Sequence, residues 1–188
     1  MGVRPVLGLC FTILIVAIAA PAAAELRISS LSVYLNDQDV TVQIAVLGTI
    51  PASFTESIRS GIASHVRFTV ELWQYRRAWL DRLLQTRMIE RQLLYNVLTK
   101  EFKVASLAGE TREPYISREL RDAQRVLSEL RGVKLMPAAQ LDPSELFYVR
   151  VRAEAALRGQ NTFLTRLSGA AEETPWTDSS LLTVSLVQ

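Results

Sequence analysis

The stretch VRFTVELWQY, residues 66 to 75, decides the fold because apolar and polar side chains alternate along it without interruption. The apolar row comprises Val66, Phe68, Val70 and Leu72. Successive side chains of a β-strand point to opposite faces, so this period of two predicts a strand with one face in the core. Trp73 and Tyr75 then lie on the opposite face, which a second sheet, a helix, a ligand or a partner could cover.

The segments before this strand predict a hairpin. Residues 40–46 alternate cleanly between Val or Ile and smaller or polar residues. Residues 26–35 also alternate, but their phase changes at Ser29 and Ser30, which indicates a bulge or bend. The residues NDQD at 36–39 are typical of a turn.

The segments after it predict further strands. Residues 86–95 and 101–104 read as a hairpin, and a continuous helix over 77–98 is the alternative. The most regular alternation is FYVRVRAEAAL at 147–157, with Tyr148, Arg150, Arg152 and Glu154 outward. The segment LLTVSLV at 181–187 predicts a last strand.

Two amphipathic helices are expected between these strands. Ser53 with Glu56 three residues later forms a capping-box pattern, and the helix that follows is expected to end near Ser64. A second helix is predicted from Ile116 to Leu130, with Gly132 as its C-terminal cap. Its apolar stripe comprises Ile116, Leu120, Ala123, Leu127 and Leu130.

These elements predict a mainly β (α+β) protein. Strands outnumber helices, short turns join consecutive strands, and the strand-helix-strand rhythm of a parallel sheet is missing from the pattern. We therefore expect an antiparallel, sandwich-like sheet protein in which the two amphipathic helices serve as crossovers or covers.

The N-terminus resembles a secretory leader. Arg4 is followed by an apolar run over residues 6–20, and Pro21 precedes a row of alanines. The run is shorter than the roughly 20 residues that span a bilayer. We expect residues 1–24 to be a signal peptide and 25–188 a single globular domain exported to the periplasm. If the leader is retained, it is the expected membrane contact.

Composition restricts the chemistry. The 21 Lys and Arg residues nearly balance the 19 Asp and Glu residues, which argues against nucleic acid as a partner. The single cysteine, Cys10, lies in the leader, and His65 is the single histidine. No glycine-rich phosphate loop or nucleophile elbow is recognisable. We therefore assign no catalytic residue, no cofactor and no metal, and expect that the protein is not an enzyme.

The face opposite the apolar row supplies the candidate partner-binding surface. It consists of Trp73, Tyr75, Arg76, Arg77, Trp79 and Asp81. Aromatic residues and arginine dominate binding hot spots. One alternative is a carboxylate-type sugar site with Glu71 and Asp81 between Trp73 and Trp79. Another is a purely structural surface on which Arg stems pack over aromatic rings.

The arginines also suggest an anion-binding site, although this signal is weaker. Arg150 and Arg152 share one face of a predicted strand, and Arg76 and Arg77 follow another. Together they could bind an anion or a lipid headgroup. More often such residues form the solvent side of a sheet.

Three segments resemble a known family. They are GIASHVRFTVELWQYRRAWLD (61–81), LLYNVLTKEFKV (93–104) and LFYVRVRAEAAL (146–157). They resemble the exported bacterial proteins of the domain of unknown function 4390 family. The matching positions are Gly61, Arg77, Trp79 with Asp81, Tyr95, Leu98 with Thr99, and Phe102 with Val104.

The resemblance implies an exported, periplasmic protein without an assigned activity. Members of that family are often encoded beside a membrane sensor kinase of the nitrogen-regulation type, so the resemblance also implies an accessory role. Our leading hypothesis is a non-enzymatic envelope protein, a binding or accessory module for a protein partner such as the external domain of that kinase. The second is a carrier of a small apolar or anionic ligand, and the third is a carboxylate-type hydrolase.

Overall fold

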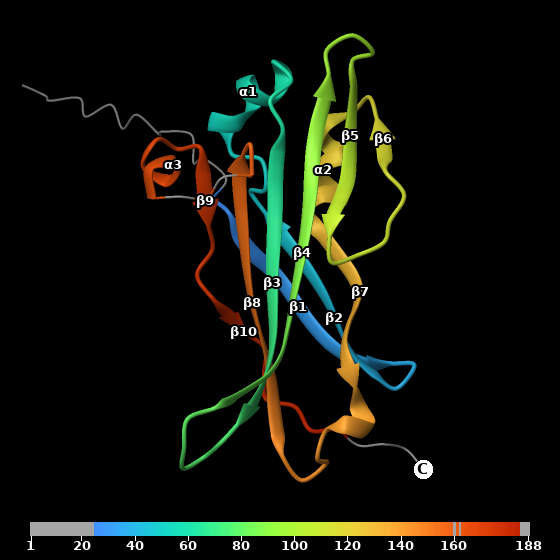
Figure 1. Ribbon diagram of the computed structural model, residues 1–188, viewed down its shortest axis with the longest axis vertical. Helices are drawn as coiled ribbons and strands as arrows, with labels where there is room; N and C mark the ends of the chain where they lie inside the picture. The colour runs from blue at the N-terminus through green and yellow to red at the C-terminus, as the bar shows by residue number, and fades with distance from the viewer. Residues whose placement is uncertain (1–24, 160, 162, 185–188) are drawn as a thin grey trace, which may run out of the picture.

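The protein is an elongated antiparallel sandwich (Figure 1). The computed structural model describes residues 25–159, 161 and 163–184, so the predicted leader and the end of the predicted last strand lie outside the described residues. The strands are β1 (Arg27–Asn36), β2 (Asp39–Leu47), β3 (Ser64–Tyr75), β4 (Arg82–Asn96), β5 (Glu101–Ala108), β6 (Tyr115–Ser117), β7 (Glu129–Pro137), β8 (Leu146–Leu157), β9 (Ala171–Glu173) and β10 (Thr177–Asp178). The helices are α1 (Thr55–Arg59), α2 (Leu120–Ser128) and α3 (Phe163–Leu167), with 3₁₀ turns η1 (Ala52–Phe54) and η2 (Ala138–Gln140).

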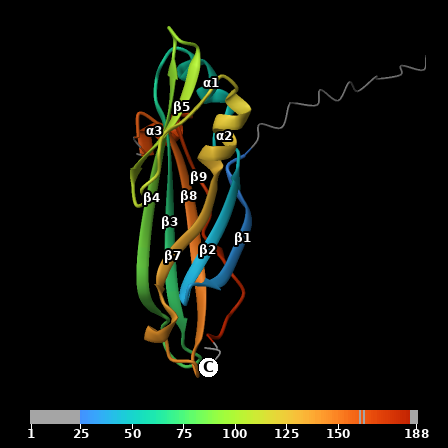
Figure 2. The same ribbon diagram turned by 90° about the vertical axis from the view of Figure 1, so that its right-hand side faces the viewer.

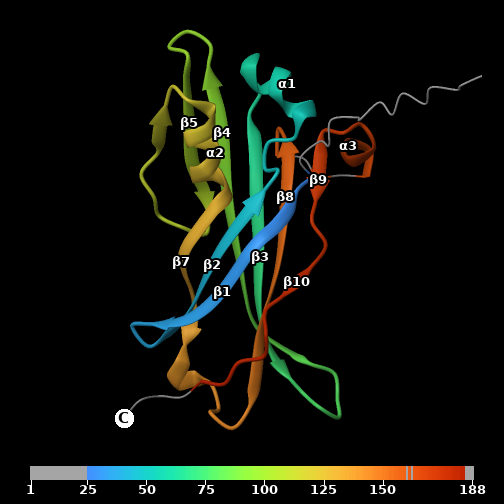
Figure 3. The ribbon, with the colours of Figure 1, turned by 180° about the vertical axis from the view of Figure 1, so that it is seen from behind.

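Two sheets form the layers. The smaller sheet has the order β1-β2-β7, and the larger has the order β10-β8-β3-β4-β5-β6, with β9 also paired to β8. The smaller sheet crosses the larger one obliquely (Figures 2 and 3). Helix α2 contacts β4, β5 and β6 and so extends the layer that the smaller sheet begins. The mainly β, sandwich-like prediction is confirmed.

Strand β3 lies at the centre of the larger sheet. It pairs antiparallel with β8 on one side and with β4 on the other along nearly its whole length. All four members of its apolar row are fully buried, and the side chains between them are half-buried on the outer face. The predicted alternation is therefore confirmed, with Trp73 on the outer face.

Both predicted hairpins are present. In the β1–β2 pair the register shifts between Ile28 and Ser30, which is the bulge expected from the change of phase. Residues 86–95 and 101–104 fall within the paired strands β4 and β5. The alternative helix over 77–98 is wrong, because this stretch contains the whole of β4 and parts of the turns on either side of it.

The first helix is shorter than predicted. The Ser53 hydroxyl donates to the carbonyl of Gly169 instead of capping α1, so the capping box is wrong. Helix α1 ends at Arg59 rather than near Ser64. Gly61 has φ 89°, and the backbone bonds Ile62 N to Ser57 O and Gly61 N to Ile58 O complete a Schellman ending.

The second helix is also shorter, at both ends. Ile116 lies in β6, opposite Lys103 of β5, and not on the helix. At the other end the chain passes from α2 directly into β7, which has no counterpart among the predicted strands. Gly132, with φ 69°, lies inside β7 at a register shift against β2 and does not cap the helix.

The chain that follows β8 turns back and runs along this strand, and we call it the strap. Two short strands, β9 and β10, pair with β8, and Leu182 forms an isolated bridge to Phe147. The predicted strand at 181–187 is wrong over its described residues, because 181–184 form only that bridge. The strap covers an edge of β8 that would otherwise be open to pairing with another strand.

Candidate functional site

The turn between β3 and β4 forms one end of the molecule (Figure 1). We call its exposed residues 77–80 the tip. Trp79 and Leu80 are 77% and 82% exposed, and Arg77 is exposed beside them. Trp79 and Leu80 are adjacent, so together they expose one apolar patch that includes a large aromatic ring, a feature found at protein contact surfaces.

The tip is held to the sheet by one carboxylate. Asp81 accepts a hydrogen bond from the backbone N–H of Arg76 at 2.9 Å, which closes the turn on itself. Its second oxygen accepts the hydroxyl proton of Tyr148, on β8, also at 2.9 Å. The exposed Trp79 and Leu80 therefore extend from a turn that is tied both to itself and to the neighbouring strand.

Below the tip, side chains of β3 and β8 form an aromatic cluster, which we define as Trp73, Tyr148, Arg150 and Asp81. Trp73 lies directly opposite Tyr148 in the strand register, and their rings stack with centroids 6.4 Å apart and planes 10° apart. The Arg150 guanidinium lies 5.6 Å from the Trp73 ring centroid and 5.7 Å from that of Tyr148. The structural alternative, Arg over aromatic rings, describes this packing correctly.

The polar groups of the aromatic cluster form hydrogen bonds with neighbouring side chains. The Trp73 indole N–H donates to Glu71 at 2.8 Å, and Arg150 forms two hydrogen bonds with Asp178 of β10, at 2.8 and 3.0 Å. Burial raises the pKa of Tyr148 to about 12, and its hydrogen bond to Asp81 acts in the same direction. The Tyr148 hydroxyl therefore remains a donor to Asp81 at neutral pH.

Four of the six predicted contact residues separate into two groups. Trp73 and Asp81 belong to the half-buried aromatic cluster, while Arg77 and Trp79 lie exposed on the tip. Tyr75 and Arg76 are half-buried between them. In the sugar-site alternative, the two Trp rings would flank the acids together, but one ring stacks on Tyr148 and the other extends into solvent.

Two residues of the cluster were missing from the predicted surface. Tyr148 and Arg150 were recognised as outward residues of their strand, but nothing in the sequence placed that strand beside β3. The cross-strand register supplies this information, since it sets Trp73 against Tyr148 and Glu71 against Arg150.

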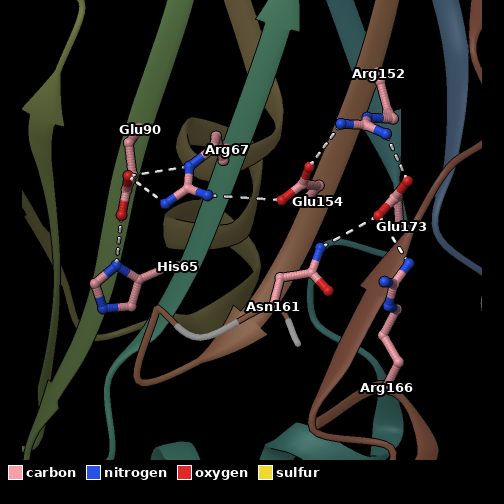
Figure 4. Close-up of polar contacts among 8 residues, drawn as sticks. All are labelled: His65, Arg67, Glu90, Arg152, Glu154, Asn161, Arg166 and Glu173. Carbon is pink, nitrogen blue, oxygen red and sulfur yellow. Dashed lines mark hydrogen bonds and ion pairs between the residues drawn. The ribbon is translucent and has the colours of Figure 1, made fainter. Parts of the chain in front are cut away.

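A charge ladder crosses the other half of the same outer face (Figure 4). It comprises His65, Glu90, Arg67, Glu154, Arg152, Glu173 and Arg166. Arg67 joins neighbouring strands, because it bonds Glu90 at 3.0 Å and lies 3.7 Å from Glu154. Acids and arginines alternate across four strands, so the ladder fastens the C-terminal strap to the sheet.

His65, at one end of the charge ladder, contacts two side chains of β4. Its Nδ1 lies 3.1 Å from a Glu90 oxygen, and its Nε2 lies 3.2 Å from the Gln92 amide nitrogen. The amide is a donor, so in neutral His65 Nε2 is the acceptor and Nδ1 carries the proton that Glu90 accepts. Both ring nitrogens are thus occupied by side chains of β4.

The Glu90 carboxylate is stabilised in its charged form. Burial opposes ionisation, but the hydrogen bonds from Arg67 and His65 outweigh it and lower the pKa of Glu90 below its ordinary value of 4.5. A carboxyl whose pKa is depressed by folding stabilises the folded state above its unfolded pKa. That contribution is lost as pH falls through the folded pKa.

We predict that Glu90→Gln lowers the free energy of unfolding by about 1–3 kcal/mol near neutral pH, because it removes the charge that Arg67 and His65 bond. The deficit relative to the wild type should shrink as pH falls below 4.5. Urea unfolding of both proteins at about pH 7 and about pH 3 measures the difference. An equal deficit at both pH values would contradict this role for the ionised carboxylate.

Across residues 25–159, 161 and 163–184, no group of three or more His, Cys, Asp or Glu residues is placed to hold a metal ion. Over the same residues, no helix has the length and apolar character needed to cross a bilayer.

Comparison with known proteins gives one result. The family model described as Domain of unknown function (DUF4390) matches residues 23–158, which include the tip and the strands on either side of it. Comparisons with curated proteins and with solved structures found no match. The family match covers more than half of the chain and ends just before the strap. The chain therefore belongs to the Domain of unknown function (DUF4390) family.

Proposed function

We propose that this protein is a non-enzymatic binding or accessory module of the cell envelope that contacts a protein partner through the tip. The observation that carries the proposal is the exposure of Trp79 and Leu80 on a turn that Asp81 fixes in place. The proposed location is the periplasm, and the proposed partner is the external domain of a membrane sensor kinase, as the family resemblance implies.

The construction of the tip supports binding rather than packing. A partner that receives Trp79 buries a large aromatic surface, and a turn ordered beforehand loses less conformational entropy on binding. Asp81 supplies that order through Arg76 and Tyr148. The exposed Arg77 adds a cation at the rim, where charge steers association.

A second candidate function is the carriage of a small apolar or anionic ligand. Apolar side chains of both sheets, such as Ile44 and Phe68, are fully buried and belong to one hydrophobic cluster. Two cavities lie at the surface around α2, and the one between β4, α2 and the start of β7 is lined mainly by charged residues. These features favour an anionic ligand at the surface over an apolar ligand between the layers.

We predict that Arg77→Ala combined with Trp79→Ala abolishes co-purification of the partner and changes the free energy of unfolding by less than about 0.5 kcal/mol. Loss of a hot-spot Trp costs about 2 kcal/mol or more of binding. Trp73 is a poorer choice for this test, because its ring packs on Tyr148 and its removal would also disturb the fold.

The matched control for this pair is Leu98→Ala. Leu98 is 93% exposed in the turn between β4 and β5, at the opposite end of the molecule (Figure 1). The Leu98→Ala substitution removes exposed apolar surface without changing the tip, so this variant should retain the partner. Retention by the tip variant, or equal loss from both variants, would refute the assignment.

A further inference from the structure

We infer that a second site, separate from the tip, binds a small organic anion that bears a phosphate or carboxylate group. The site is a concave pocket of about 450 Å³ between β4, the loop after β5, helix α2 and the start of β7. Its charged residues are Arg91, Glu110, Arg112, Arg125, Glu129 and Arg131. Small-molecule sites commonly have about 300–1,000 Å³.

The balance of charge in this pocket favours an anion. Four arginines line it, against two glutamates. Both glutamates are already engaged, Glu110 by Arg91 and Glu129 by Arg131. Within the described residues neither Arg112 nor Arg125 forms an ion pair, so two guanidinium groups remain to bind a ligand.

The pocket has a rigid wall. Arg91 is 2% exposed and is fixed by two bonds to Glu110 and by bonds to the backbone oxygens of Val126 and Glu129. These bonds join β4, the loop that carries Arg112 and the helix that carries Arg125. The two uncommitted arginines are therefore attached to elements that Arg91 holds together.

The chemistry of guanidinium identifies the ligand class. Its planar set of N–H donors matches two oxygens of a phosphate or carboxylate, and such charge-assisted bonds are the strong ones. The volume exceeds that of a bare ion and fits an organic molecule that carries the anionic group. A phospholipid headgroup presents the same chemistry, and the experiment separates it from a free anion.

The test titrates the full exported chain with inorganic phosphate and with citrate, by calorimetry and by the arginine Nε–Hε signals in NMR spectra. The variants are Arg112→Gln with Arg125→Gln, both exposed and outside the core, and the matched control is Arg87→Gln, an exposed arginine of β4 outside the pocket. We expect saturable binding by the wild type and the control, and a rise in Kd of about tenfold or more in the double variant.

A parallel measurement uses flotation with phosphatidylcholine vesicles that contain phosphatidylglycerol. Flotation that depends on Arg112 and Arg125, without binding of either free anion, would support the site and assign its ligand to a lipid headgroup. The inference is overturned if phosphate, citrate and the vesicles all fail to bind. It is also overturned if the double variant binds them as the wild type does. Because Trp79 lies at the far end of the molecule, Trp79→Ala should leave anion binding intact, so this site and the proposed partner surface fail independently.

Discussion

Arg91→Ala is expected to lower the free energy of unfolding by about 3–5 kcal/mol, because it removes one partner of a buried ion pair. The carboxylate of Glu110 would lose both of its bonds to the guanidinium. The carbonyls of Val126 and Glu129, at the junction of α2 and β7, would lose donors at 2.5 and 2.7 Å. Urea unfolding followed by circular dichroism measures the loss.

Two further variants make this prediction specific. Arg87→Ala removes an exposed arginine from the same strand and should change stability by less than about 0.5 kcal/mol. Arg91→Lys keeps the charge but has no planar fork to bond Glu110 and two carbonyls together, so it should recover only part of the loss. A loss below about 1 kcal/mol for Arg91→Ala would contradict the role assigned to this side chain.

Phe68→Ala is expected to have an effect of similar size, about 3–5 kcal/mol. Phe68 is fully buried in the apolar row of β3, where β4 and β8 pair with the strand on both sides. Because paired strands on both sides restrict any collapse of the backbone, the lost ring would leave a cavity and not only a smaller buried surface. Thermal and urea unfolding of the variant measure the cost.

The adjacent residue is the control for Phe68. Thr69 lies on the outer face of the same strand and is half-buried. Thr69→Ala should cost less than about 1 kcal/mol, since it leaves no internal cavity. Similar losses for Phe68→Ala and Thr69→Ala would show that the two faces of β3 are not distinguished by burial.

Alternation of side chains was sufficient to predict the strands that have one buried face. The apolar rows of β2, β3 and β8 are each buried as their period indicates, and the change of phase at Ser29 and Ser30 marks a real bulge. These predictions succeed because the alternation is a local property of the chain and the apolar face of each strand packs in the core.

The helix-to-strand junction was not predictable in the same way. Leu130 continues the helical spacing of the apolar residues of α2, but it is buried as part of β7. The spacing therefore does not show where the helix ends and the strand begins. Arg91, far away in the sequence, donates to the carbonyl of Val126 in the last turn of the helix and to that of Glu129 at the start of β7. This contact joins residues that are far apart in the sequence, so it cannot be predicted from the residues at the junction alone.

The candidate site was predicted in its composition but not in its assembly. Trp73, Trp79 and Asp81 were recognised from residue type and spacing. Their division into a packed cluster and an exposed tip depends on Tyr148, which reaches Asp81 from β8. Strand order decides that contact, and period-two patterning carries no information about which strands are neighbours.

Photo-crosslinking in the intact cell envelope shows directly whether the tip contacts a partner protein. A photoreactive phenylalanine analogue replaces Leu80 in one protein and Leu98 in another, so that one probe occupies the tip and the other the opposite end. If the tip contacts a partner, the probe at position 80 alone should give a discrete adduct with a protein, and replacement of Trp79 by alanine should reduce it. An adduct from Leu98 but not from Leu80, or the same adduct from both positions, would contradict the proposed contact.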